Sequence, residues 1–200
     1  MVLIFLAGCA IAAMAAWDAH SANRAAAKIS FDSIADKVVT AIRENMDTYE
    51  QVLRGGVALF DAMGEVSRQQ WAIYVDALDL STNYSGIQGI GYVAVVDPQG
   101  ISKLEERAHS EGLSEFKVHP PGNRELNTAI LYLEPMDWRN RRALGYDMYA
   151  EDVRRVAMRR AWKTENPSLS RAVTLLQETG ESVQKGVVLF LPVFSKEPAG

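Results

Sequence analysis

The chain has 200 residues, of which 48% are hydrophobic and 23% are charged, a composition typical of a folded globular protein rather than a disordered one. Its formal net charge is -4 and its isoelectric point is near 5.4. A nucleic-acid partner requires a clustered basic surface, so these values argue against one. The single cysteine, Cys9, excludes an internal disulfide and a multi-cysteine metal site.

The chain begins with a strongly apolar segment. Residues 2–17 contain no charged or strongly polar side chain, although a membrane-spanning helix usually needs about 20 apolar residues. We interpret residues 1–17 as a transmembrane helix that lacks its cytoplasmic start, with Trp17 at the membrane interface. The alternatives are a cleaved signal peptide without the usual basic n-region and a lipoprotein signal ending at Cys9. All three interpretations place the residues after 17 outside the inner (plasma) membrane, in the periplasm or the extracellular space.

Residues 18–60 are predicted to form one long helix. Alanine is abundant in this segment, proline is absent, and glycine first appears at Gly55. Apolar side chains recur at steps of three and four residues and draw one stripe along the helix. The stripe either packs against the chain's own domain or pairs with a second copy, and we expect a homodimer through this stalk. Its members are Phe31, Ile34, Val38, Ile42, Met46, Tyr49 and Leu53.

Residues 61–200 are predicted to form a region in which helices alternate with strands. Ser67 and Gln70 have the spacing of a capping box, which marks the start of a helix. The buried face of this helix is predicted to consist of Trp71, Tyr74, Val75 and Leu78. A turn-rich stretch at 81–86 then leads to a strand at 88–96, a turn at 97–100 and a helix at 101–111.

Short strands and one further helix are predicted for the second half of this region. The strands occupy residues 116–119, 129–134, 172–176 and 186–194, the last two joined through Thr179-Gly180-Glu181, and the helix occupies residues 151–163. This order predicts an α+β fold, in which a long N-terminal helix precedes PAS-like antiparallel sheet subdomains with flanking helices. We expect the chain to be cut after its last strand.

The charged side chains do not form a recognisable catalytic or metal centre. The sequence contains no Gly-x-Ser-x-Gly motif, no phosphate-binding glycine loop and no His-Glu-x-x-His motif. His109 with Glu105 and Glu106 could bind a metal, but a solvated helix face explains these residues better. The sequence therefore predicts a protein that is not itself an enzyme and that needs no metal or cofactor. A solvated helix face is also the interpretation of Arg154, Arg155, Arg159 and Arg160.

Better-placed polar residues lie around the predicted strand at 129–134. Glu125 precedes this strand, Tyr132 and Glu134 lie within it, and Gly145-Tyr146-Asp147 follows it. A ligand pocket is mostly apolar with a few oriented polar groups, and these side chains could supply them. Alternatively, the two carboxylates satisfy backbone donors at strand ends and the two tyrosines are core aromatics. The residues alone leave both interpretations open.

An ordered set of segments carries a family resemblance. The segments are residues 53–60, 66–71, 84–92, 131–135, 144–148, 154–161 and 189–194. In this order they resemble the CHASE domain, an extracellular sensor of histidine kinases, diguanylate cyclases and plant cytokinin receptors. No single segment is specific, but the ordered set is.

The resemblance implies two PAS-like subdomains after the long helix, with a ligand pocket in the membrane-distal one. Glu125 matches the position of a ligand-binding carboxylate in plant members, although the residue there is a shorter aspartate, so cytokinin is not carried over as the ligand. The resemblance also points to the backbone after Gly145, and therefore to Tyr146 and Asp147. Thr174 and Leu175 fall on a strand that lines the pocket in those members. With Tyr132, these residues are the predicted ligand-binding set.

Together these observations predict an extracytoplasmic sensor of an unidentified small molecule. The family normally continues into a second membrane helix and a cytoplasmic output domain, of the histidine kinase or diguanylate cyclase type. Ligand binding would reach that output through the stalk helix. One alternative is a membrane-anchored hydrolase that uses Glu125 or Asp147 as a base. Another is a dimerisation or protein-interaction module without a small ligand.

Overall fold

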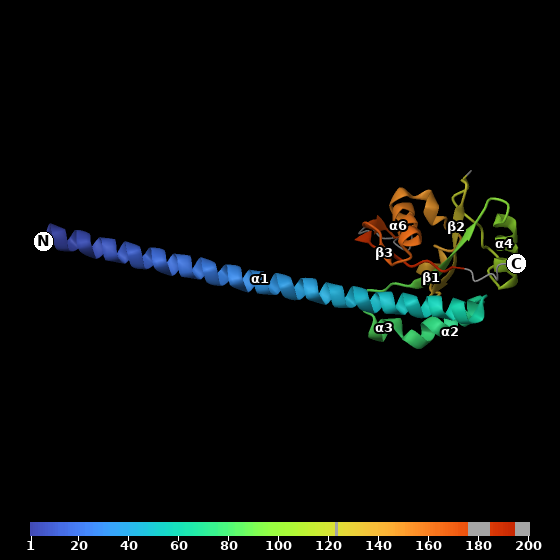
Figure 1. Ribbon diagram of the computed structural model, residues 1–200, viewed down its shortest axis with the longest axis horizontal. Helices are drawn as coiled ribbons and strands as arrows, with labels where there is room; N and C mark the ends of the chain where they lie inside the picture. Colours follow the sequence, from blue (N-terminus) through green and yellow to red (C-terminus); the bar gives the residue numbers. More distant parts are fainter. Residues whose placement is uncertain (123, 176–184, 195–200) are drawn as a thin grey trace. The chain divides into compact units, whose positions relative to one another are not determined.

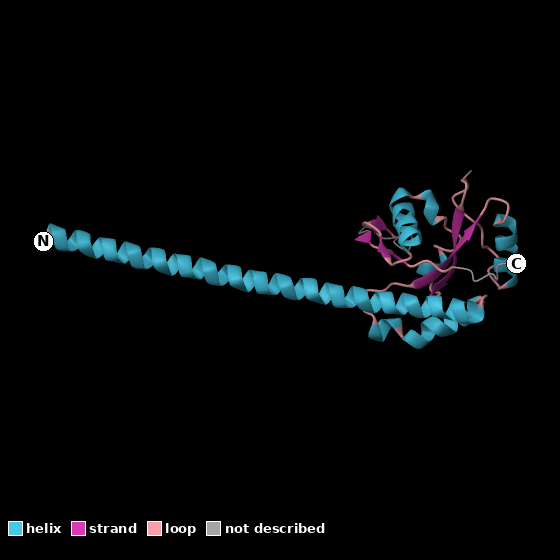
Figure 2. Ribbon diagram, in the orientation of Figure 1, coloured by secondary structure: helices cyan, strands magenta, loops and turns pink. Residues whose placement is uncertain are grey.

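The computed structural model describes residues 1–122, 124–175 and 185–194, and within the first helix it describes only part of the side chains. Figure 1 shows the elements in sequence colours, and Figure 2 distinguishes helices from strands. The chain divides into two compact units, Met1–Thr48 and Tyr49–Gly200.

The first unit consists of the N-terminal part of helix α1. This helix spans Val2–Met63, so the long helix predicted over 18–60 is present and begins earlier. Phe31, Ile34, Val38 and Ile42, all from the predicted stripe, are each more than half exposed. Within the described part of the chain, no helix is both long enough and apolar enough to cross a membrane.

In the second unit, the end of α1 packs against α2 (Arg68–Leu78). Two glycines of α1 make this close approach possible, because a Cβ atom at Gly55 would lie 2.6 Å from the Tyr74 hydroxyl. At Gly56 it would lie 3.2 Å from the Trp71 ring. The predicted capping box is confirmed: Ser67 Oγ accepts a hydrogen bond from Gln70 N, and Gln70 Oε1 accepts one from Ser67 N.

The centre of the second unit is the antiparallel pair β1 (Ile90–Val96) and β2 (Asn127–Glu134). Every residue of β2 is buried. Two short helices precede and follow β1. They are α3 (Leu80–Asn83), which overlaps the first half of the turn-rich stretch predicted at 81–86, and α4 (Ile101–Ser110), which confirms the helix predicted at 101–111.

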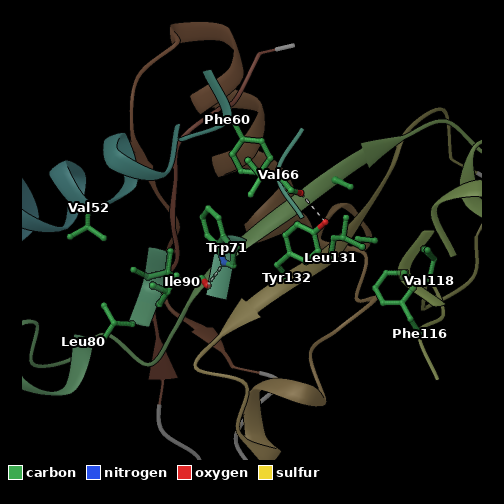
Figure 3. Close-up of a cluster of buried hydrophobic side chains, with 14 residues drawn as sticks. Val52, Phe60, Val66, Trp71, Leu80, Ile90, Phe116, Val118, Leu131 and Tyr132 are labelled. Carbon is green, nitrogen blue, oxygen red and sulfur yellow. Dashed lines mark hydrogen bonds between the residues drawn. The ribbon is translucent and has the colours of Figure 1, made fainter. Parts of the chain in front are cut away.

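The hydrophobic core joins these elements (Figure 3). The Phe60 ring of α1 lies 4.3 Å, centroid to centroid, from the Tyr92 ring of β1. Trp71 of α2 is buried and donates its indole N–H to Ile90 O. Each large apolar side chain that is fully buried contributes about 1.5–3 kcal/mol, so this contact between helices and sheet stabilises the whole unit.

The part of the chain after β2 contains more and shorter elements than predicted. It contains α5 (Trp138–Arg141), the 3-10 helix η1 (Met148–Ala150) and α6 (Asp152–Thr164). The two long final strands are wrong as predicted, because the described residues form only two-residue strands in antiparallel pairs. These are β3 (Ser168–Leu169) with β6 (Leu189–Phe190), and β4 (Val173–Thr174) with β5 (Lys185–Gly186). Leu176 and the predicted joining turn lie outside the described residues.

The strand predicted at 116–119 is also wrong, since only an isolated bridge forms there, between His119 and Tyr146. The Val118 N–H donates to the Glu105 carboxylate instead of to a neighbouring strand. The bridge cannot extend into a ladder, because Pro121 has no N–H to donate on this side and the Gly145 N–H donates to Ile130 O instead of Lys117 O. The α+β class is nevertheless confirmed: a long N-terminal helix precedes small antiparallel sheets with flanking helices.

Candidate ligand-binding site

A hollow of about 490 Å³ lies in the second unit between α6 and the β4–β5 pair. Its volume falls within the range of small-molecule pockets. Its lining combines apolar and charged side chains: Tyr146, Glu151, Arg154, Ala172, Val173, Thr174, Leu175 and Lys185. A second hollow, of about 610 Å³, is lined only by side chains of α1 between Ile29 and Glu44. One helix cannot enclose a ligand, so we take the first hollow as the candidate site.

Arg154 lies in the first turn of α6 and is only 4% exposed. Its Nη2 donates to Thr174 O at 3.0 Å, and its Nη1 forms an ion pair with Glu151. Its guanidinium lies over the Tyr146 ring, 5.6 Å from the centroid. Burial lowers the pKa of Arg154, against the opposing effect of Tyr146. The solvated face predicted for the arginines of this helix is therefore wrong for Arg154.

Lys185 approaches the same threonine from the neighbouring strand. Its Nζ donates to Thr174 Oγ1 at 2.9 Å, because residues 174 and 185 are partners in the β4–β5 pair. Thr174 thus accepts one hydrogen bond from Arg154 and one from Lys185, through two different oxygens. The arrangement holds two cationic side chains at one wall of the pocket.

Three of the residues predicted from the sequence come together at this pocket. They are Tyr146, Thr174 and Leu175. Gly145 lies next to Tyr146 in the chain and has a backbone role: its N–H donates to Ile130 O and its carbonyl accepts from His119 N. With φ at +78°, a Cβ atom at this position would lie 2.1 Å from Lys117 O, which only glycine avoids.

Asp147 is fully buried but does not line the pocket. One carboxylate oxygen accepts hydrogen bonds from Thr128 N, Thr128 Oγ1 and Tyr149 N, and the other pairs with Arg124 at 3.0 Å. The side chain thereby caps η1 and ties it to β2. Because its acceptor sites are occupied, this carboxylate is poorly placed to act as a hydrolytic base, and its contacts favour the structural interpretation.

Tyr132 and Glu125 do not line the pocket either. Tyr132 is fully buried in the core, and its hydroxyl lies 3.1 Å from Val66 O and 3.2 Å from Glu111 Oε1 (Figure 3). Removal from water raises the pKa of Tyr132 to about 12, although Arg107 nearby opposes this shift. Glu125 is exposed on the loop before β2.

Sequence reasoning missed Arg154, Glu151 and Lys185 as site residues. A signal for Arg154 was present, since it shares the buried stripe of Ala157 and Ala161 at helical steps of three and four residues. For Lys185 the sequence offers no comparable signal, because its position depends on a pairing of only two residues.

The described residues contain no group of three metal-binding side chains. His109 and Glu105, which could have formed a metal site, instead fix the loop after α4. His109 Nε2 lies 2.9 Å from Phe116 O, and Glu105 accepts the N–H of Val118. Both side chains therefore have a structural role.

Comparison with known families gives one match. The family model described as CHASE domain matches residues 64–200. None of the curated proteins compared with the chain matches it significantly.

Proposed function

Because the chain belongs to the CHASE domain family, we propose that it binds a small molecule in the pocket between α6 and the β4–β5 pair. CHASE domains are extracellular sensor domains of receptors and are not themselves catalytic. In the proposal, the bound molecule is the signal and the receptor's output lies elsewhere in the protein.

The pocket is the observation that carries this proposal. It has the volume of a small-molecule site, and apolar side chains of residues 172, 173 and 175, in and beside β4, lie next to a few polar groups. Tyr146, Thr174 and Leu175 reach it from two separate parts of the chain. The binding site therefore depends on the fold and responds to shifts of α6 against the strands.

A route from the pocket to α1 supports a signalling role. Tyr146 O accepts a hydrogen bond from Ile130 N of β2, two residues before Tyr132. The Tyr132 ring lies 5.9 Å from the Tyr92 ring, which contacts Phe60 near the end of α1. A ligand that prefers one arrangement of these elements would shift the population toward it.

The proposal extends to the receptor as a whole. We propose that residues 1–17 anchor the chain in the inner membrane, with the following residues outside the cytoplasm. Two copies then pair along the exposed stripe of α1, and the shift reaches a histidine kinase or diguanylate cyclase output. The apolar sequence of residues 2–17 and the exposure of Phe31, Ile34 and Val38 support these steps.

The test is a thermal-shift screen of the full chain, in detergent, against a broad panel of small metabolites. A ligand that binds only the folded state stabilises it by about 2.7 kcal/mol at a hundredfold excess over its dissociation constant. Ala172→Phe fills the pocket with an aromatic ring and should abolish the shift. The matched control is Ala77→Phe, at an exposed position of α2 outside the pocket, which should retain it. A shift that persists in Ala172→Phe, or no shift with any compound, would contradict the proposal.

A further inference from the structure

We infer that the pocket between α6 and the β4–β5 pair binds a small organic anion, namely a carboxylate joined to a short apolar group. The inference rests on the proposed ligand-sensing function and specifies the class of ligand. It follows from the hydrogen-bonding state of Arg154, from the charges of the lining and from its apolar part.

Arg154 carries a buried donor without an acceptor. Two of its guanidinium nitrogens are engaged, by Thr174 O and by Glu151. Its Nε is buried and has no hydrogen-bond partner among the described residues. Buried polar groups in folded proteins are almost always hydrogen-bonded, so an unpaired donor on a residue that lines the pocket favours a ligand that supplies an acceptor. A carboxylate matches the planar guanidinium better than any neutral acceptor.

The charges of the pocket lining favour an anion. Arg154 and Lys185 are cationic, Glu151 is the one carboxylate among the lining residues, and that carboxylate is already paired with Arg154. The charge of Lys185 has only the neutral Thr174 hydroxyl as a partner in the pocket. A cationic ligand would meet the repulsion of Lys185, whereas an anion would be attracted by both cations.

The rest of the lining defines the body of the ligand. Ala172, Val173 and Leu175 are apolar, and the Tyr146 ring carries the guanidinium on its face. A short aliphatic or aromatic group can pack there while its carboxylate faces Arg154. The carboxylate that the family resemblance suggested for ligand binding, at Glu125, is exposed and does not line this pocket.

The experiment compares carboxylates with their uncharged amides on the full chain in detergent, at constant ionic strength. The probes are acetate, butyrate, hexanoate, benzoate and phenylacetate, each paired with its primary amide, and the readout is the dissociation constant. At least one acid should bind about tenfold or more tightly than its amide, since hydrogen bonds to charged groups are the stronger ones. In nitrogen-15 spectra the Nε–H resonance of Arg154, assigned by its loss in Arg154→Lys, should move on addition of that acid.

A charge variant at an exposed position keeps the test independent of folding. Lys185→Gln should weaken binding of the acid by roughly threefold to fivefold, the effect of a solvent-exposed charge. Lys163→Gln removes the same charge from an exposed position of α6 outside the pocket and should leave the affinity unchanged.

The outcomes separate this inference from the proposed function. Equal binding of acids and amides, equal effects of Lys185→Gln and Lys163→Gln, or an immobile Arg154 resonance overturns the anionic ligand class. If no acid binds but another metabolite still stabilises the chain and is blocked by Ala172→Phe, the inference fails while the sensor proposal stands. If nothing binds, both fail.

Discussion

At the scale of single residues, Tyr132 connects the turn after α1 to β2 and α4. Its buried hydroxyl lies within hydrogen-bond distance of Val66 O and Glu111 Oε1, and Arg107 Nη2 donates to it at 3.3 Å. The sequence placed Tyr132 in a ligand-binding set. The structure places it where helices and sheet meet, so its chemistry contributes to stability.

Stability should fall at alkaline pH because of this tyrosine. An unfolded tyrosine has a pKa near 10, whereas burial raises the pKa of Tyr132 to about 12. Between these values the unfolded chain releases a proton that the folded chain retains, so the free energy of unfolding decreases as pH rises. Full titration costs about 3 kcal/mol, and no loss from this group is expected below pH 10. Urea unfolding between pH 9 and 12 measures this, and Tyr132→Phe should reduce the loss. An unchanged pH profile in the variant would assign the loss to other groups.

Substitution of Gly145 by alanine, compared with the same substitution at Gly112, distinguishes the cost of a steric clash from the cost of backbone strain. Gly145→Ala adds a Cβ atom 2.1 Å from Lys117 O, whereas Gly112→Ala, at a similar φ of +89°, has no atom within 4 Å. The cost of the left-handed conformation alone is about 1–2 kcal/mol, and we expect Gly112→Ala to show it. Gly145→Ala should cost clearly more and broaden the thermal transition. Equal losses of stability in the two variants would show that the backbone at Lys117 moves away without cost and that no steric clash occurs.

The sequence shows which residues are charged, but it does not show whether their side chains are solvated or buried. Arg154 belongs to a group of four arginines at helical spacing, and the spacing is the same whether a side chain is solvated or buried. Thr174 and Leu175 were indicated only through the family resemblance, whereas Tyr146 was also indicated by its position after the predicted strand at 129–134. Their meeting in one pocket depends on two-residue strands that no periodic pattern marks.

At the scale of elements, the contact between α1 and α2 is governed by a pair of glycines. Glycine inside a helix normally costs about 1 kcal/mol relative to alanine. Here Gly55 allows the Tyr74 hydroxyl to approach α1 and donate to Val52 O at 2.6 Å. The packing of the two helices therefore offsets the poor helix propensity.

A double-mutant cycle tests this contact. Gly55→Ala should destabilise the wild-type chain, because the new methyl group meets the Tyr74 hydroxyl at 2.6 Å. In the Tyr74→Phe background the same substitution should stabilise by up to about 1 kcal/mol, since only helix propensity remains. Thermal unfolding of the four proteins gives the coupling. A destabilisation of equal size in both backgrounds would contradict close packing at this point.

Elements with a local signature were predicted well. The capping box fixed the start of α2, and the predicted helices at 101–111 and 151–163 correspond to α4 and α6 with ends shifted by one residue. The prediction of a strand at 116–119 failed for a physical reason: Phe116 and Val118 are buried, but their backbone does not pair with a neighbouring strand. Hydrophobicity predicted their burial, but the side chain that takes the Val118 N–H lies on α4.

At the scale of the whole molecule, the exposed stripe of the first unit predicts self-association. Val38→Glu places a charge in the stripe and removes an apolar side chain from each copy. The dissociation constant of a homodimer should therefore rise about tenfold or more, since burial of a valine contributes at least about 1.5 kcal/mol. Thr40→Glu, two residues on and on the opposite side of the helix, should have little effect. Light scattering of the full chain in detergent measures the mass over a range of concentrations. Equal masses for the two variants would place the stripe outside any interface.

Hydrogen exchange measures directly whether a small molecule binds in the pocket between α6 and the β4–β5 pair. Exchange is compared with and without the compound that gives the largest thermal shift. Protection should be concentrated at residues 146–154 and 172–175, the two segments that supply most of the pocket lining. Protection confined to other segments, or no change with any compound of the panel, would contradict it.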